Sequence, residues 1–576
     1  MSSLNQAPEF IMSSTKDYIP NFEPLNSSSK KTSSRDSTQK KIPNKDDTIK
    51  EQKKFKESDA GDGTTREDQI LTGSKFYLCV SSLTLCMLLI ALDQMITAAV
   101  LSVISNHFNE FDKLTWITSA YMVPMGCCAQ VWGRLSINFG RKWTLVAGLL
   151  LFEIGSLLAG IAVSMNMLIL GRAIQGIGGS CIQTVVTIIT TEITTIDKRP
   201  VLFAVMGLTY VVASVLGPII GGIFGTYASW RWCFYLNLCC SAIIFPFFIL
   251  TYRPKMPKTT LREKLKTIDF LDNFFMVSSC VLLLLGLSFG QTSNEWGSVS
   301  VISCFVLGGI LLIIFIAWNF KYSKYPVIPK KVFFNKHIFI CFLIIMMSYS
   351  AMMVCIQFLS VYFENVIGHN AFHTGLSLIP LAVTVSSTSI INGILMKVSS
   401  LIKIYSLISV FLLPVAVGLM MLLSTKENLG NSIGFQFLLG ASNGLNFQGP
   451  FMTAMLHAPK EPGSTILTTA FINFGRSIGT AAFSNISAEI YSSTLRYYLA
   501  KISDSLQEKE YPIEEILLRS DLISRMNKHD HELVIRQMLL SIHNVFWMVF
   551  AISILTLVTT LFMSNQRLPK QSEVET

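Results

Sequence analysis

The stretch MLILGRAIQGIGGS (residues 167–180) places one arginine, Arg172, inside a segment that otherwise has the composition of a membrane helix. An arginine at the centre of a membrane helix costs at least about 2.5–3.5 kcal/mol on insertion scales. It therefore needs a partner, a water-filled cavity or a route to the membrane surface. The rest of the chain has to supply one of these.

The whole chain is too apolar for a soluble protein. Of its 576 residues, 51% are hydrophobic and 14% are charged, whereas a soluble domain carries about 25% charged residues. The apolar residues gather in runs of about twenty, and at about 1.5 Å per residue each run crosses a hydrocarbon core of about 30 Å. We therefore expect an all-α polytopic membrane protein with fourteen spans. These are 77–99, 115–135, 144–163, 167–189, 201–224, 233–251, 269–290, 299–320, 338–362, 374–396, 402–423, 431–456, 465–489 and 541–563.

The basic residues set the expected orientation. Most of the Lys and Arg residues between spans lie in alternate connections, around 134–142, 198–199, 252–268 and 321–337. Cytosolic loops carry an excess of Lys and Arg. These connections are therefore assigned to the cytosol, and an even number of spans places both termini there. Because the basic residues are dispersed among short loops, the net charge of +10 does not indicate a nucleic-acid partner.

Two basic linkers divide the spans into groups of six, two and six. Paired six-helix halves are common in secondary transporters. The first residues are rich in Ser, Lys, Asp and Thr, with too few large apolar side chains to fold alone. The expected parts are a disordered cytosolic tail (1–75), an N-terminal six-helix bundle (76–251), a cytosolic linker (252–268), two extra membrane helices (269–320), a second cytosolic linker (321–337), a C-terminal six-helix bundle (338–563) with a long non-cytosolic loop (490–540), and a cytosolic C-terminal tail (564–576).

Four charged residues inside the spans are the candidate functional groups: Asp93, Glu153, Arg172 and Arg476. Asp93 lies about six residues from the outer end of the first span, and Arg172 about five residues below the same surface. At about 1.5 Å per residue, both are some 8–10 Å deep. We therefore expect Asp93 and Arg172 to share one cavity.

Two interpretations remain open for most of these groups. Asp93 is either a carboxylate hydrogen-bonded between helices or the site of a substrate cation or proton. Arg172 either extends to the outer headgroups or faces a neighbouring helix, and the glycines beside it favour the second arrangement. Glu153 either pairs with a polar neighbour or carries a proton, because burial disfavours the charged form. Arg476 is too deep to reach the surface easily, and we expect it to line a central cavity.

The segment GPIIGG (217–222) combines a proline with three glycines in the fifth span. Pro218 removes a backbone hydrogen bond and can kink the helix. Gly217, Gly221 and Gly222 allow a neighbouring helix to approach closely. The pattern predicts a hinge or a tight helix seam.

Other chemistry is not indicated. No phosphate-binding loop occurs, and neither a Ser/His/Asp nor a paired-carboxylate arrangement can be singled out. The cluster HDHE (529–532) lies in a charged loop and is interpreted as a solvated surface. We expect no enzyme activity, no cofactor and no metal site.

Several motifs in the right order resemble the major facilitator superfamily, in its fourteen-span drug:proton antiporter branch. They are LDQMITAAVLSVI (92–104) in the first span, GRLSINFGRK (133–142) after the second, LILGRAIQGIGGS (168–180) in the fourth, GPIIGG (217–222) in the fifth and WRWCFYLN (230–237) at the start of the sixth. With FEIGSL (152–157) and NVFWM (544–548), they resemble fungal azole and multidrug exporters and vacuolar basic amino acid transporters.

The resemblance implies a fold of two six-helix bundles with two extra central helices, and alternating access driven by protons that enter the cytosol. By motif position, Arg172 takes part in proton coupling and Asp93 is the acidic residue of the first span. The expected sites are a proton-coupling and substrate cavity of Asp93, Glu153, Arg172, Gln175 and Arg476, an antiporter hinge of Gly217, Pro218, Gly221 and Gly222, and a cytosolic gate of Gly133, Arg134, Gly140, Arg141 and Lys142.

The chain departs from the family pattern in two motifs. The family's loop after the second span has an aspartate where this chain has Ile137, and the first-span motif has Met95 and Ala98 at positions usually filled by other residues. The charge relay of the gate is therefore incomplete.

The resemblance implies export of small amphipathic or cationic molecules such as drugs, azoles and dyes by proton antiport, from a monomer in the plasma membrane. The alternative is proton-coupled transport of Lys, Arg or His at the vacuolar membrane. A membrane sensor that no longer transports is a third interpretation. The expected partners are a small-molecule substrate, protons and the lipid bilayer.

Overall fold

The computed structural model describes residues 58–59, 61, 64, 69–108, 110, 113–254, 264, 266–293, 296–426, 428–502 and 526–569. All of them belong to one compact unit, Lys54–Thr576. Within these ranges the chain forms helices joined by turns and short loops, and no strand occurs there. The expected linker 252–268 and the expected tails at both ends lie largely outside the described residues.

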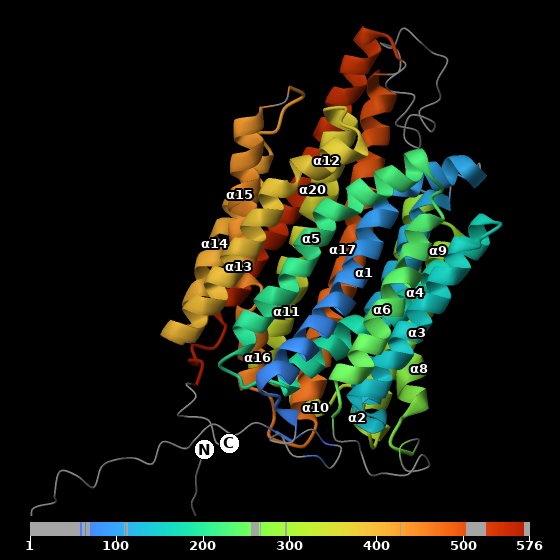
Figure 1. Cartoon of the computed structure of the whole chain (residues 1–576). Coiled ribbons are helices and arrows are strands. Elements are labelled where there is room, and N and C mark those ends of the chain that lie inside the picture. Colours follow the sequence, from blue (N-terminus) through green and yellow to red (C-terminus); the bar gives the residue numbers. More distant parts are fainter. Residues whose placement is uncertain are drawn as a thin grey trace, which may run out of the picture. The chain divides into compact units, whose positions relative to one another are not determined.

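Six helices form the N-terminal half (Figure 1). They are α1 (Gly73–Phe108), α2 (Leu114–Phe139), α3 (Arg141–Gly160), α4 (Met165–Glu192), α5 (Arg199–Tyr227) and α6 (Trp232–Thr251). α4 packs against both α3 and α2, and α1 packs along α5. Ser164 caps the start of α4, because its side chain accepts a hydrogen bond from the backbone N–H of Met167 at 3.3 Å. The helix that carries Arg172 is therefore held between two neighbours.

Two further helices, α8 (Phe270–Ser293) and α9 (Val299–Ala317), pair with each other, and α8 lies against α2 and α17. α9 continues into the short π-helix η3 (Trp318–Tyr322) and is followed by α10 (Lys330–Phe333). The segment between η3 and α10 is anchored at Val327. Its N–H donates to Asp272 Oδ2 of α8 at 2.8 Å, and its carbonyl accepts from Gln130 Nε2 of α2 at 2.8 Å. The expected second linker is thus packed between the extra helices and the N-terminal half.

The C-terminal half contains α11 (Lys336–Val361) with its extension η4 (Tyr362–Val366), α12 (Ala371–Ser377), α13 (Ile379–Ser399), α14 (Lys403–Met420), α15 (Leu429–Asn446), α16 (Gly449–Leu456), α17 (Ser464–Ile502) and α20 (Lys528–Leu561). The expected span 431–456 is two helices, with a break at Phe447 and Gln448. Pro450 lies in the first turn of α16, and proline disfavours helical continuation through the residues before it. The expected loop 490–540 is shorter than predicted, because α17 and α20 extend into it.

Every predicted span falls on a helix, and the all-α membrane fold is confirmed. Among the described residues, eleven helical segments are long and apolar enough to cross a membrane. α2, α15 and α17 are not among these segments. These three helices bury many small and polar side chains against their neighbours, and such side chains lower their hydropathy. The total of fourteen crossings and the cytosolic termini stay predictions.

The two halves contact each other through α2 against α17 and through α5 against α12 and α13. A short segment before α1 also contacts both halves. Ser58 Oγ lies 2.8 Å from Thr465 Oγ1 at the start of α17, and the backbone N–H of Leu71 donates to the carbonyl of Ile193 after α4 at 3.1 Å. This part of the chain differs from the solvated tail expected for 1–75, because it packs on the folded protein.

Candidate functional site

Arg172 finds its partner on α1. Its Nη1 lies 2.6 Å from Asp93 Oδ2, and the two side chains are only 2% and 1% exposed. Asp93 Oδ1 also accepts hydrogen bonds from Gln175 Nε2 at 2.8 Å and from Asn237 Nδ2 at 2.7 Å. The carboxylate is thus surrounded by donors from α4 and α6 as well as by the guanidinium. A buried charge is tolerable when it is paired and hydrogen-bonded in this way.

The surroundings of Arg172 place it against protein and not against lipid. The guanidinium carbon lies 4.3 Å from the centre of the Tyr121 ring on α2, within the range of a cation–π contact. A Cβ added to Gly176 would lie 2.3 Å from the carbonyl oxygen of Tyr121, and one added to Gly178 would lie 2.4 Å from the backbone nitrogen of Phe152 on α3. The glycines of α4 therefore permit the close helix contacts that enclose the arginine.

Glu153 lies beside this cluster. Its Oε1 accepts a hydrogen bond from the Ser241 hydroxyl on α6, one helical turn after Asn237. Ser156, one turn after Glu153 on α3, accepts from Gln175 Nε2 at 2.7 Å and from Asn237 Nδ2 at 3.2 Å. Asp93, Arg172, Gln175 and Asn237 thus form one polar network that reaches α3 at Ser156. Glu153 lies one turn from Ser156, and its partner is Ser241.

The GPIIGG segment forms a tight seam with α1. A Cβ added to Gly217 would lie 2.3 Å from the Met95 Cβ, and one added to Gly221 would lie 2.8 Å from the Ala99 Cβ. Gly222 has nothing within 4 Å of its hypothetical Cβ. α5 continues through this segment as one helix. Of the two sequence interpretations, the observed arrangement is the seam.

Pro218, in the same segment, contacts the other half of the molecule. A Cβ added to Gly375 on α12 would lie 3.0 Å from the Pro218 Cβ. The segment therefore packs on α1 through its glycines and on the C-terminal half through its proline.

The basic residues after α2 hold the N-terminal half together. Arg141 Nη2 lies 2.6 Å from Glu192 Oε1 at the end of α4, and both side chains are buried. Lys142 Nζ donates to the Ile249 carbonyl on α6 at 2.7 Å. Gly140 has a φ of 84° between α2 and α3, a backbone conformation that glycine adopts without strain.

The first two residues of the same motif face other elements. A Cβ added to Gly133 would lie 2.3 Å from the Cβ of Ala470 on α17, so α2 and α17 touch at this point. The Arg134 guanidinium carbon lies 5.8 Å from the centre of the Tyr325 ring in the segment before α10. The predicted gate is therefore divided between the seam of the two halves and the packing of α3, α4 and α6.

Ile137 occupies an apolar contact where the family motif has an acidic residue. It is buried in a cluster with Ile188 of α4 and with Ile466 and Leu467 of α17. At this position the two halves meet through side-chain packing instead of through a charge.

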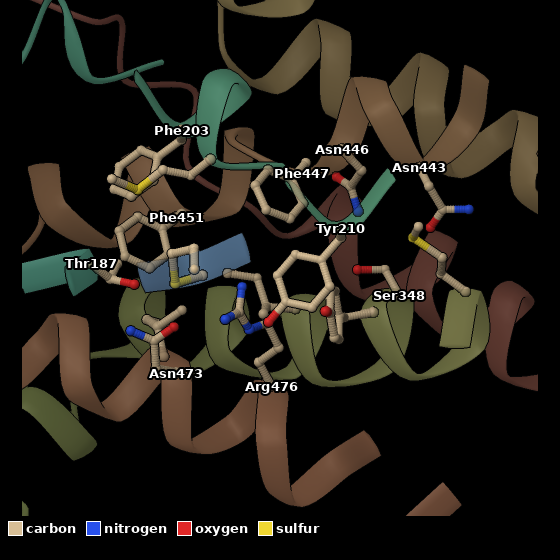
Figure 2. Close-up of a pocket in the computed structure, with 16 residues that line it drawn as sticks. Thr187, Phe203, Tyr210, Ser348, Asn443, Asn446, Phe447, Phe451, Asn473 and Arg476 are labelled. Atoms are coloured by element: carbon tan, nitrogen blue, oxygen red, sulfur yellow. The ribbon is translucent and has the colours of Figure 1, made fainter. Parts of the chain in front are cut away.

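Arg476 lies apart from the Asp93 network. It lines a cavity between the halves, whereas Asp93 does not. Figure 2 shows aromatic and amide side chains around this cavity. They come from α1, α4 and α5 on one side and from α11, α15, α16 and α17 on the other. The lining residues are Met87, Thr187, Phe203, Met206, Tyr210, Ile345, Ser348, Tyr349, Met352, Asn443, Asn446, Phe447, Phe451, Ile472, Asn473 and Arg476.

Clefts between the helices of a bundle are common binding sites for small organic molecules. Aromatic walls and a few amide groups provide apolar contact together with orientation. Among the described residues, no group of three or more His, Cys, Asp and Glu side chains is placed to hold a metal ion. The arrangement fits the binding of an organic solute and no covalent chemistry.

Sequence reasoning missed several members of these sites. Asn237 ends the WRWCFYLN motif, and an amide in an apolar helix was the signal that could have identified it. Glu192 closes α4 near a basic loop, which is a similar signal. Tyr121 and Ser241 are ordinary residues of membrane helices, and nothing in the sequence distinguishes them.

Comparison with known proteins agrees with this architecture. The sequence profile of the Major Facilitator Superfamily matches residues 83–484. The chain is 29% identical to vacuolar basic amino acid transporter 5 of Saccharomyces cerevisiae over 87% of this chain and 93% of that protein. It is 32% identical to the MFS-type transporter ppz2 of Metarhizium majus, over 78% and 76%. It is 31% identical to the efflux pump roqT of Penicillium rubens, over 72% and 78%.

A solved structure shares the fold. The crystal structure of the human organic anion transporter MFSD10 aligns with a TM-score of 0.56 at 14% identity, over 85% of this chain and all of that one. The helical architecture, the profile match and the similar transporters lead to one conclusion. The chain belongs to the major facilitator superfamily and is a membrane transporter, not an enzyme.

Proposed function

We propose that the chain is a proton-coupled antiporter that moves small amphipathic molecules out of the cytosol. The observation that carries the proposal is the buried Asp93–Arg172 pair, linked through Gln175 and Asn237 to Ser156 on a third helix, one turn after Glu153. Intramembrane carboxylates of this kind commonly relay protons in transporters.

The coupling has a physical basis. When Asp93 takes up a proton, its attraction to Arg172 is lost, and the arginine is left as an uncompensated buried charge. The network joins α1, α3, α4 and α6, so a change in this pair alters the packing of half of the N-terminal bundle. Proton binding thereby changes the relative stability of two packing arrangements of these helices. Alternating access requires such a shift between two conformations.

Efflux is supported by the relatives named as efflux pumps, and we place the chain in the plasma membrane on that ground. A second candidate is a vacuolar basic amino acid transporter, favoured by the relative that spans most of both chains. In both cases the substrate leaves the cytosol as protons enter it. A fluorescently tagged chain in yeast would distinguish the two membranes.

Purified protein in proteoliposomes tests the coupling. An acidic lumen should drive uptake of an amphipathic fluorescent substrate, and a pH dye should report proton efflux. Glu153→Gln, and the pair Asp93→Asn with Arg172→Met, should abolish gradient-driven uptake and retain substrate exchange without a gradient. Glu110→Gln is the matched control, because Glu110 forms a partly exposed pair with Lys113. Unchanged gradient-driven uptake in both variants would refute the proposal.

A further inference from the structure

Arg476 differs from Arg141 and Arg172 in the partners of its guanidinium group. Arg141 and Arg172 each contact a carboxylate at 2.6 Å. Arg476 Nε and Nη2 are buried without a hydrogen-bond partner, and the guanidinium carbon lies 4.9 Å from the centre of the Tyr349 ring. An arginine does not lose its charge in a protein. The cavity therefore contains a permanent positive charge with unused donors.

No acidic side chain is among the residues that line this cavity. A substrate cation would meet no counter-charge there and would be repelled by Arg476. An anion would supply the missing partner. The positive charge in the cavity thus favours an anionic substrate over the cations considered from the sequence.

Asn473 strengthens the argument. It lies one turn before Arg476 on α17, so both side chains share a helix face, and Figure 2 shows both beside the cavity. Its Nδ2 is also buried without a partner. Together the two side chains offer three nitrogen atoms whose N–H groups have no partner. A carboxylate, which only accepts hydrogen bonds and pairs with guanidinium in a fork, matches this donor set.

A second cavity provides space for an apolar body. It shares Tyr210, Tyr349, Met352 and Phe447 with the first cavity. Its remaining lining is mostly apolar: Met95, Gly207, Ser214, Met353, Ile356, Leu378, Leu381, Ala382, Val385 and Ser389. The first cavity therefore suits the charged end of an amphipathic molecule, and the second cavity suits its apolar end.

We infer that the substrate is an amphipathic organic carboxylate, whose charged group binds Arg476 and Asn473 and whose apolar body enters the second cavity. This inference rests on the proposed transport function and names its substrate class. Asn446 Oδ1, which is also buried without a partner, would accept a hydrogen bond from an N–H or O–H group on the same molecule.

Equilibrium binding to the purified protein in detergent tests this inference without any proton gradient. The probes are 1-naphthylacetate, its neutral amide and the cation 1-naphthylmethylammonium, which share the same two-ring body. The carboxylate should bind at least about tenfold more tightly than the other two, as the loss of one charge-assisted hydrogen bond implies. Equal binding of the three, or preference for the cation, would overturn the inference.

Substitutions locate the binding group. Arg476→Met should remove the preference for the carboxylate, and the binding of the neutral amide that remains shows that the variant is folded. Asn473→Asp should also remove the preference for the carboxylate, because the new side chain on the same helix face supplies Arg476 with an anionic partner. A carboxylate preference that survives Arg476→Met would place the anion elsewhere and refute the assignment. Carboxylate-specific binding without proton-driven uptake would instead contradict only the proposed antiport.

Discussion

Arg172 and Asp93 are 79 residues apart in the sequence, and a contact of 2.6 Å between them joins α4 to α1. The pair is almost completely buried, so its contribution to the free energy of unfolding depends on both members being present. Removal of one member leaves an uncompensated charge, whereas neutralisation of both leaves no buried charge at this position.

This pair should show strong non-additivity. Asp93→Asn and Arg172→Met alone should each lower the free energy of unfolding by about 3–5 kcal/mol, and the double variant should recover most of that loss. The measurement is thermal or denaturant unfolding of the four proteins in one detergent. Additive losses in the double variant would show that the two charges do not stabilise each other.

The Arg141–Glu192 pair allows a comparison between a buried and an exposed ion pair. Glu192→Gln removes the carboxylate that contacts the buried Arg141 at 2.6 Å and should cost about 3–5 kcal/mol of stability. Lys331 and Glu461 also form an ion pair, but their side chains are 69% and 55% exposed. Glu461→Gln should therefore change stability by less than about 1 kcal/mol. Similar melting temperatures for the two variants would contradict this assignment of energies.

The seam between α5 and α1 should be sensitive to a single methyl group. Gly217→Ala places a Cβ within 2.3 Å of the Met95 Cβ, and such overpacking should cost about 1–3 kcal/mol. Gly222→Ala meets nothing within 4 Å and should stabilise the helix by up to about 1 kcal/mol. Melting temperatures of the two variants check this difference. If Gly217→Ala is neutral, α1 and α5 do not pack this closely in the membrane.

The helices could be predicted because a membrane imposes a simple rule of length and apolarity. The rule does not predict helical residues that lie beyond the apolar runs. α17 and α20 continue well beyond the expected spans. The expected span 431–456 is interrupted, because α15 ends at Asn446 and α16 begins at Gly449, just before Pro450. Polar helical turns outside the bilayer and local backbone sterics leave no trace in a hydropathy pattern.

The sites were partly predictable for a similar reason. Depth along two helices sufficed to bring Asp93 and Arg172 together, because both ends of each span could be counted. The isolation of Arg476 from any carboxylate depends on which helix faces meet across the two halves. A single sequence contains no spacing or depth pattern from which this arrangement of helix faces could be predicted.

The aspartate of the family motif can be restored at Ile137 by a single substitution. Ile137→Asp would place a carboxylate among Ile188, Ile466 and Leu467, whose side chains offer no hydrogen-bond donor. Burial of such a charge is costly unless it is paired, so the contact of α2 and α4 with α17 should weaken. Leu467→Cys provides the probe: its maleimide labelling from the predicted cytosolic side should rise severalfold with Ile137→Asp. Ile137→Val, which should cost only about 0.5–1.5 kcal/mol, should leave labelling unchanged. Equal labelling in all three backgrounds would show that this apolar cluster does not hold the two halves together.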